Sequence, residues 1–194
     1  MDIVLTGTGS PLPDANRAGP SSLVKAGDTH ILVDAGRGVV MRMAGAGSMP
    51  HRLAGVLITH LHSDHICDLN DVITMNWVMT QGNGTLKIYG PPGIAEFVKR
   101  QIYALELDVG YRIAHHEPLT EGPRVDVTEL EVHVLRDVAA RAAVLLRLLF
   151  VDRGLGLRQG LARVEARLEH LVLDLDQLER GVGRALVDRG DGRD

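Results

Sequence analysis

A short apolar stretch that ends in a run of histidines and one aspartate is the feature that most limits what this chain can fold into. Residues 53–59 are apolar enough for a buried strand, and His60-Leu61-His62-Ser63-Asp64-His65 follows at once. Neutral imidazole is the commonest metal ligand in proteins, and a neighbouring carboxylate adds an oxygen ligand and a proton acceptor. The composition of this run therefore predicts a metal site at the end of a strand.

The spacing of the run divides its donors into two pairs. His60 and His62 would share one face of an extended segment, so they could hold one ion. Asp64 and His65 follow where the chain leaves the strand, and their offset suggests ligands for a second ion beside the first. A chance cluster of this kind is expected on the order of once in a thousand sequences of this composition. We therefore expect two adjacent metal ions.

Apolar periodicity predicts strands that alternate with helices through the first half of the chain. The expected strands are residues 3–6, 22–25, 31–34, 53–59 and 86–89, and the expected helices are 38–46, 68–79 and 93–107. The last helix would turn inward the residues Ile94, Phe97, Val98, Ile102 and Leu105. This alternation suits a sheet packed against helices, so the sequence predicts an α/β fold.

Asp34 stands at the end of an apolar strand, where an inward carboxylate is costly unless it is paired. It could orient a metal-bound histidine or Asp64. It could equally be a turn-forming aspartate before Ala35 and Gly36. The sequence leaves both roles open.

Three other features resemble functional motifs, but a structural role is expected for each of them. The glycines of residues 7–11 lack the third glycine of a dinucleotide fingerprint, so a tight turn beside the site is expected. His115 and His116 would face opposite ways on a strand, which favours surface or supporting positions over ligation. Cys67, the single cysteine, is expected to be a small buried apolar residue, and one cysteine excludes an intrachain disulfide.

With Thr59, the histidine run resembles the Thr-His-x-His-x-Asp-His signature of the metallo-β-lactamase-fold hydrolases. Residues 4–11 with Arg17, residues 31–36 and residues 88–93 are similar, in this order, to landmarks of the ribonuclease Z-like branch. The resemblance covers residues 1–131 as one portion. It implies a metallo-β-lactamase-type αββα sandwich.

The resemblance also implies a chemistry. It places His60 and His62 on one Zn²⁺ and Asp64 and His65 on another, with Asp64 as the proton acceptor. In such a site a metal-bound hydroxide attacks a phosphodiester. The implied activity is that of an endonuclease that processes the 3′ end of precursor tRNA.

Residues 132–194 depart from the family. The later family ligands, a His in a Thr-Asp-His segment, an Asp in a Gly-Asp-Thr segment and a late His, have no match, and every Lys and Pro precedes residue 124. A foreign or frame-shifted end would look like this, and so would a divergent helical tail. An apolar heptad pattern over residues 161–182 could dock on the domain or pair two chains. We expect an incomplete sandwich followed by a divergent, helical tail with a frayed end.

Charge and hydropathy limit the substrates and the cellular location that can be expected. Residues 1–133 hold ten basic and fifteen acidic residues, a formal charge of −5. This negative charge opposes the binding of RNA, which is a polyanion. A small phosphodiester, a sulfate ester or another ester is therefore a rival substrate, and a catalytically inactive family member that acts through its tail is a third alternative. No membrane span or signal peptide is recognisable, so a cytoplasmic protein without a membrane partner is expected.

Overall fold

The computed structural model describes residues 2–130, which contain six strands, five α-helices and one 3-10 helix. Three strands come first, and helices precede each of the last three strands. The strands are β1 (Asp2–Gly7), β2 (Ser21–Ala26), β3 (Thr29–Val33), β4 (Leu53–Leu57), β5 (Thr85–Gly90) and β6 (Arg124–Glu129). The helices are α1 (Val39–Gly45), η1 (Pro50–Arg52), α2 (Ser63–Ile66), α3 (Leu69–Met79), α4 (Ile94–Ala104) and α5 (Glu106–His115). Within these residues, none of the helices has the length and apolar content needed to cross a membrane.

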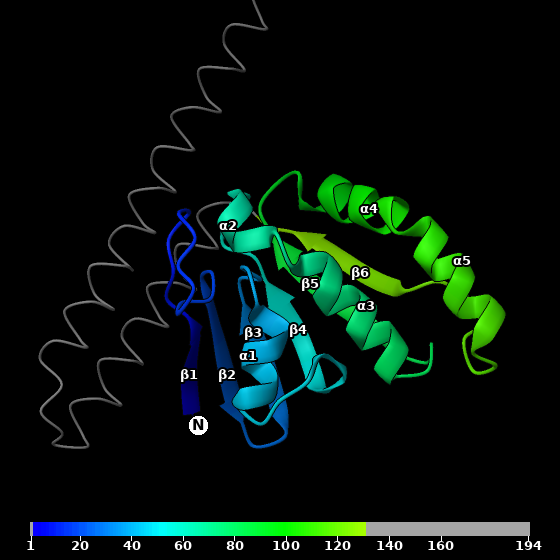
Figure 1. Ribbon diagram of the computed structural model, residues 1–194, viewed down its shortest axis with the longest axis horizontal. Coiled ribbons are helices and arrows are strands. Elements are labelled where there is room, and N and C mark those ends of the chain that lie inside the picture. The colour runs from blue at the N-terminus through cyan, green and yellow to red at the C-terminus, as the bar shows by residue number, and fades with distance from the viewer. Residues whose placement is uncertain (1, 131–194) are drawn as a thin grey trace, which may run out of the picture. The chain divides into compact units, whose positions relative to one another are not determined.

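The strands form one sheet in the order β1-β2-β3-β4-β5-β6. β1, β2 and β3 pair antiparallel, whereas β3, β4, β5 and β6 pair parallel (Figure 1). A short turn suffices between antiparallel neighbours, but a parallel neighbour needs a crossover segment, and helices fill those crossovers here. The parallel part brings the carboxyl ends of β3 and β4 to one edge of the sheet.

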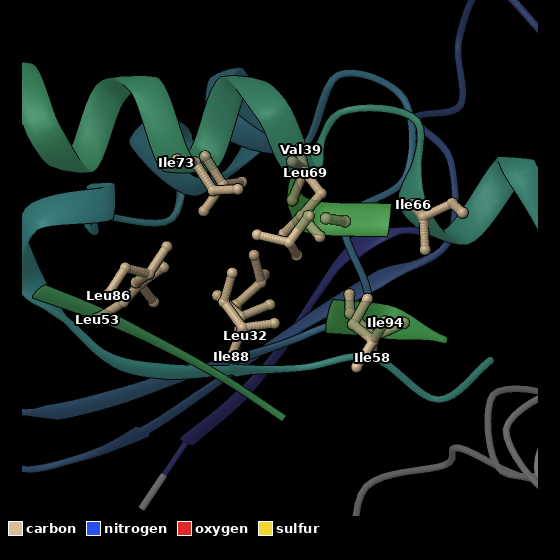
Figure 2. Close-up of a cluster of buried hydrophobic side chains, with 14 of the residues drawn as sticks. Leu32, Val39, Leu53, Ile58, Ile66, Leu69, Ile73, Leu86, Ile88 and Ile94 are labelled. Carbon is tan, nitrogen blue, oxygen red and sulfur yellow. The ribbon is translucent and has the colours of Figure 1, made fainter. Parts of the chain in front are cut away.

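One cluster of buried side chains joins the sheet to the helices (Figure 2). Leu32 and Val56 of the sheet and Leu69 of α3 are completely inaccessible to solvent. Successive residues of a strand point to opposite faces, and Ile31 in the same strand as Leu32 is 38% exposed. The described residues therefore form a sheet with a helical layer packed on one of its faces.

The predicted strands and helices are present, with two differences in extent. The predicted strand over residues 53–59 is shorter in the structure and ends at Leu57, although the Ile58 amide still donates to the Tyr89 carbonyl at 2.7 Å. The predicted helix over residues 93–107 was wrong in its length, because Leu105 leaves the helical conformation (φ −102°, ψ 11°) and α5 begins at Glu106. Two acidic residues in the first turn of α5 suit the positive end of a new helix dipole.

Four of the five residues predicted to face inward over residues 93–107 do so, whereas Leu105 is half-buried and does not belong to the core cluster. Ile94 and Val98 are buried, and Phe97 and Ile102 pack partly buried against the core. The expectation of a strand at His115 and His116 was wrong, because α5 extends through His115. The predicted tail, residues 132–194, lies outside the described residues, as does the heptad pattern within it.

Candidate functional site

The predicted site lies at the edge of the sheet where β3 and β4 end. Asp34 follows β3 directly, and its amide donates to the Leu57 carbonyl at 2.8 Å, which ties the ends of the two strands together. His60 and His62 follow β4 in an extended segment, and Asp64 and His65 lie in α2. Segments that are about 30 residues apart in sequence are thus brought together by parallel pairing, and the carboxyl ends of parallel strands are common ligand sites.

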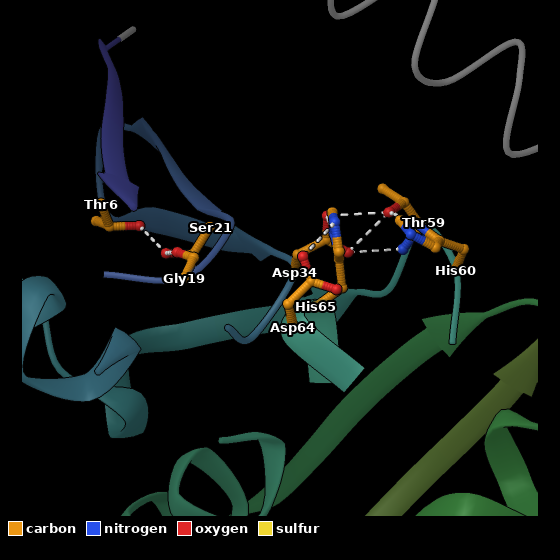
Figure 3. Close-up of polar contacts among 8 residues, drawn as sticks. All are labelled: Thr6, Gly19, Ser21, Asp34, Thr59, His60, Asp64 and His65. Atoms are coloured by element: carbon orange, nitrogen blue, oxygen red, sulfur yellow. Dashed lines mark hydrogen bonds and ion pairs between the residues drawn. The ribbon is translucent and has the colours of Figure 1, made fainter. Parts of the chain in front are cut away.

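Asp34 is the centre of the hydrogen bonding at this edge (Figure 3). Its buried carboxylate accepts from the Thr59 amide at 2.9 Å, from the Thr59 hydroxyl at 2.9 Å to each oxygen, and from His65 Nδ1 at 2.8 Å. Its backbone has φ 61°, in the left-handed region that few residues other than glycine adopt and that aspartate tolerates. Asp34 therefore lies in the turn, and its carboxylate also contacts a histidine of the run.

The three imidazoles of the run are adjacent. The ring centroids of His60 and His65 are 4.0 Å apart, and those of His60 and His62 are 4.7 Å apart in an edge-on arrangement. His60 is 2% exposed and Asp64 is 5% exposed, whereas His62 is open to solvent. Asp64 Oδ2 lies 3.8 Å from His65 Nε2. All four predicted donors therefore gather at one place, with one histidine accessible from outside.

Close backbone packing fixes the segment that carries Asp64 and His65. The Ala35 amide donates to the His65 carbonyl at 2.7 Å, and the Asp68 amide donates back to the Ala35 carbonyl at 3.0 Å. A Cβ atom on Gly36 would lie only 2.5 Å from the Asp64 carbonyl oxygen. Only glycine allows the two backbones to approach so closely.

Two supporting residues were not assigned a role by the sequence analysis. Thr59 bridges Asp34 and His60, since its Oγ1 also lies 3.0 Å from His60 Nδ1. Asp68 accepts from the Gly38 amide at 2.5 Å, just before α1. The sequence could have drawn attention to Thr59, because Thr59 is the first residue of the Thr-His-x-His-x-Asp-His motif. Its hydrogen bond to Asp34 could not be predicted from the sequence.

The donor types suit a metal ion, but the described part of the chain does not complete a site. Imidazole and carboxylate groups are the nitrogen and oxygen ligands that zinc uses. Among residues 2–130, however, no group of three or more His, Cys, Asp or Glu side chains is arranged to hold one ion. Further ligand-type side chains of the sequence, for instance His133, Asp137 and His170, lie outside the described residues.

The other candidates of the sequence analysis do not join the cluster. His115 and His116 are exposed, and His115 Nδ1 donates to the Tyr111 carbonyl at 2.7 Å, one turn earlier in α5. Cys67 is half-buried, not fully buried as expected, and burial together with the Asp68 carboxylate raises the pKa of its thiol. The glycine-rich segment folds back on itself, with the Gly9 amide donating to the Ala18 carbonyl at 2.7 Å.

Comparison with known proteins agrees with this architecture. A ribonuclease Z of Mycobacterium sp. (strain KMS) is 52% identical over 138 residues, which are 71% of this chain and 48% of the relative. A ribonuclease Z of Mycobacterium avium (strain 104) is 53% identical over 131 residues, 66% of this chain and 47% of the relative. The crystal structure of human tRNase Z, short form, superposes with a TM-score of 0.53 at 27% identity and covers 68% of this chain and 45% of that one.

The sheet, its helical layer and the histidine run define a metallo-β-lactamase-fold protein of the ribonuclease Z-like branch, which confirms the predicted resemblance and fold class. The chain belongs to the family described as Anti-Pycsar protein Apyc1, whose model matches residues 1–123. The chain spans about half the length of the curated relatives it matches.

Proposed function

We propose that this chain carries the N-terminal ligands of a metal-dependent hydrolase site of the ribonuclease Z type. His60 and His62 would hold one Zn²⁺, and Asp64 and His65 would hold a second. The observation that supports this most is the gathering of three imidazoles, with ring centroids 4.0 and 4.7 Å apart, beside the buried Asp64 carboxylate. Such a group has no role in the packing of an apolar core.

Each residue has a part in this proposal that follows from its surroundings. A bound divalent ion supplies Lewis-acid chemistry, which polarises a phosphodiester and makes water more acidic. His62 is open to solvent, so an ion held there could be reached by a substrate. Asp64 accepts a proton, and Asp34 holds the ring of His65 through the bond at Nδ1.

Completion of the site needs further ligands. Four side chains shared between two ions give each ion two protein ligands, whereas a catalytic zinc normally has three. We propose that the missing ligands come from residues beyond 130 in this chain or from a second chain. The sequence holds further ligand-type side chains beyond residue 130, for instance His133, Asp137 and His170.

The proposed substrate is a phosphodiester, with precursor tRNA cut at its 3′ end as the first candidate. The relatives named ribonuclease Z and tRNase Z support it. A small phosphodiester is the second candidate, because the formal charge of −5 over residues 1–133 opposes the binding of a polyanion. The two substrates differ in their dependence on salt, since only the RNA relies on many phosphate contacts.

The test is hydrolysis by the full chain with added Zn²⁺, measured on a precursor tRNA and on bis(p-nitrophenyl) phosphate in parallel. Replacement of the proton acceptor, Asp64→Asn, is expected to lower the rate by about 10²–10⁴-fold. The control is Asp28→Asn in the exposed turn between β2 and β3, which should leave the rate unchanged. Equal rates for the two variants, or no hydrolysis of either substrate by the zinc-loaded chain, would contradict the proposal.

A further inference from the structure

A continuous chain of hydrogen bonds joins His60 to His65 through Thr59 and Asp34 (Figure 3). Thr59 Oγ1 lies 3.0 Å from His60 Nδ1 and 2.9 Å from each carboxylate oxygen of Asp34. His65 Nδ1 lies 2.8 Å from Asp34 Oδ2. Thr59, His60 and Asp34 are each no more than 6% exposed, so water competes little for these bonds.

The direction of each bond follows from the hydrogens available. A carboxylate only accepts, so His65 must donate to Asp34 through an Nδ1–H group. Thr59 has one hydroxyl hydrogen, and its contact with Asp34 is favourable only if that hydrogen points to the carboxylate. The same oxygen can then only accept from His60, whose Nδ1 must therefore carry a hydrogen.

The Thr59 hydroxyl has little freedom to turn elsewhere. The backbone amide of Thr59 also donates to Asp34 Oδ1, at 2.9 Å, so the residue is attached to the same carboxylate at two points. Breaking the hydroxyl bond would leave a buried carboxylate oxygen short of a donor, which costs more than the loss of an exposed bond.

We propose that Thr59 is a positioning residue that fixes neutral His60 in its Nδ1–H tautomer, in the same way that Asp34 fixes His65. Both rings then carry their lone pair on Nε2. This inference deepens the proposed function and rests on it only for the use of those lone pairs by a metal ion. Neutral histidine in water favours the opposite tautomer, with the hydrogen on Nε2, so the arrangement has to be imposed by the protein.

The consequence for metal binding is direct. An imidazole binds a metal through a lone pair, and the hydrogen bond at the other nitrogen decides which nitrogen has it. A His60 ring with the hydrogen on Nε2 would have to change its tautomer before it could bind through that atom. Groups that hold metal-bound histidines in this way typically change metal affinity by about 10–100-fold when they are removed.

Two further histidines of the chain serve as internal references. His115 Nδ1 contacts the Tyr111 carbonyl, which only accepts, so His115 should show the Nδ1–H form without any metal site. His51 is exposed in η1 and should show the tautomer that water favours. The two signals calibrate the spectrum for His60 and His65.

The experiment is a long-range ¹H–¹⁵N correlation spectrum of the full chain, labelled with ¹⁵N-histidine, treated with chelator and recorded at a pH of about 8.5, where ordinary histidines are neutral. We expect the Nδ1–H pattern for His60 and His65. In Thr59→Val, which keeps the shape and loses the hydroxyl, His60 should change to the Nε2–H pattern while His65 keeps its own. Thr59→Ser, which restores a hydroxyl, should return His60 to Nδ1–H.

The outcomes separate this inference from the proposed function. An Nε2–H pattern for His60 in the unmodified chain overturns the inference, even if Thr59→Val does not fold. An Nδ1–H pattern that survives in folded Thr59→Val also overturns it. A zinc titration of the same samples tests the metal site by itself: failure of the unmodified chain to bind zinc, with His60 in the Nδ1–H form, would reject the proposed metal site and keep the assignment of Thr59.

Discussion

At the scale of single residues, the site combines groups whose identity is plain in the sequence with contacts that are not. The histidine run marks His60, His62 and His65 because three imidazoles in six positions are rare. The paired role of Asp34 could be expected, because an inward carboxylate needs a partner. The bridge through Thr59 could not be expected from the sequence. It depends on the left-handed backbone conformation of Asp34, whose carboxylate contacts Thr59 just after β4.

A buried histidine outside the candidate site, His30, makes the free energy of unfolding depend on pH. His30 is 3% exposed and its Nδ1 lies 2.7 Å from Ser48 Oγ. Burial lowers the pKa of His30 below 6.5, and the nearby Arg52 and Lys25 charges lower it further. The folded chain therefore keeps His30 neutral at a pH where the unfolded chain has already taken up a proton.

The sign of the effect follows from that difference. His30 costs no stability above a pH of about 6.5, and the free energy of unfolding falls as the pH drops from there to the lowered pKa. We predict that His30→Gln reduces this loss, as measured by urea unfolding at several pH values between about 7.5 and 5. His51→Gln, at an exposed position, is the control. An unchanged pH dependence in His30→Gln would refute the assignment.

At the scale of elements, apolar periodicity predicts most of the sheet and the long helices, because the core uses one face of each. It does not show where α4 ends, since Leu105 continues the apolar pattern while its backbone leaves the helix. β6 was also missed, although Val125 and Val127 alternate with polar residues as in a half-buried strand. The short helix α2 has no periodicity to detect, because it is a single turn held by contacts from Ala35 and Gly36.

The contact at Gly36 gives a prediction for the element that carries Asp64 and His65. In Gly36→Ala, the new methyl group would meet the Asp64 carbonyl oxygen at 2.5 Å and the Gly19 backbone at 2.6 Å. Overpacking of this kind typically costs about 1–3 kcal/mol. We expect a loss of that size in the free energy of unfolding, measured with urea.

The matched control is Gly45→Ala, because nothing lies within 4 Å of a Cβ at Gly45, the last residue of α1. Alanine is favoured over glycine in a helix by roughly 0.5–1 kcal/mol, so this variant should be neutral or slightly more stable. Equal stability of the two variants would show that α2 can move away from Gly36, and that the close approach does not hold the site.

At the scale of the whole molecule, the described residues supply the sheet, one helical layer and four donors at one edge. The sequence predicts this α/β arrangement because the strands and helices alternate and the motif follows a strand. The sequence does not predict which further ligands complete the metal site, because ligands that are distant in sequence come together only in the folded chain. The proposed metal centre therefore needs ligands besides these four.

The central claim is that the histidine run binds metal, and elemental analysis tests it most directly. The full chain would be stripped with chelator, reloaded with Zn²⁺ and desalted, beside His60→Ala/His62→Ala and the control His115→Ala/His116→Ala, which removes two exposed histidines of α5. We predict bound zinc, up to two ions for a completed pair of sites, in the unmodified chain and in the control, and its loss in the first variant. Absence of bound zinc from the unmodified chain, or equal zinc in both variants, would contradict the account.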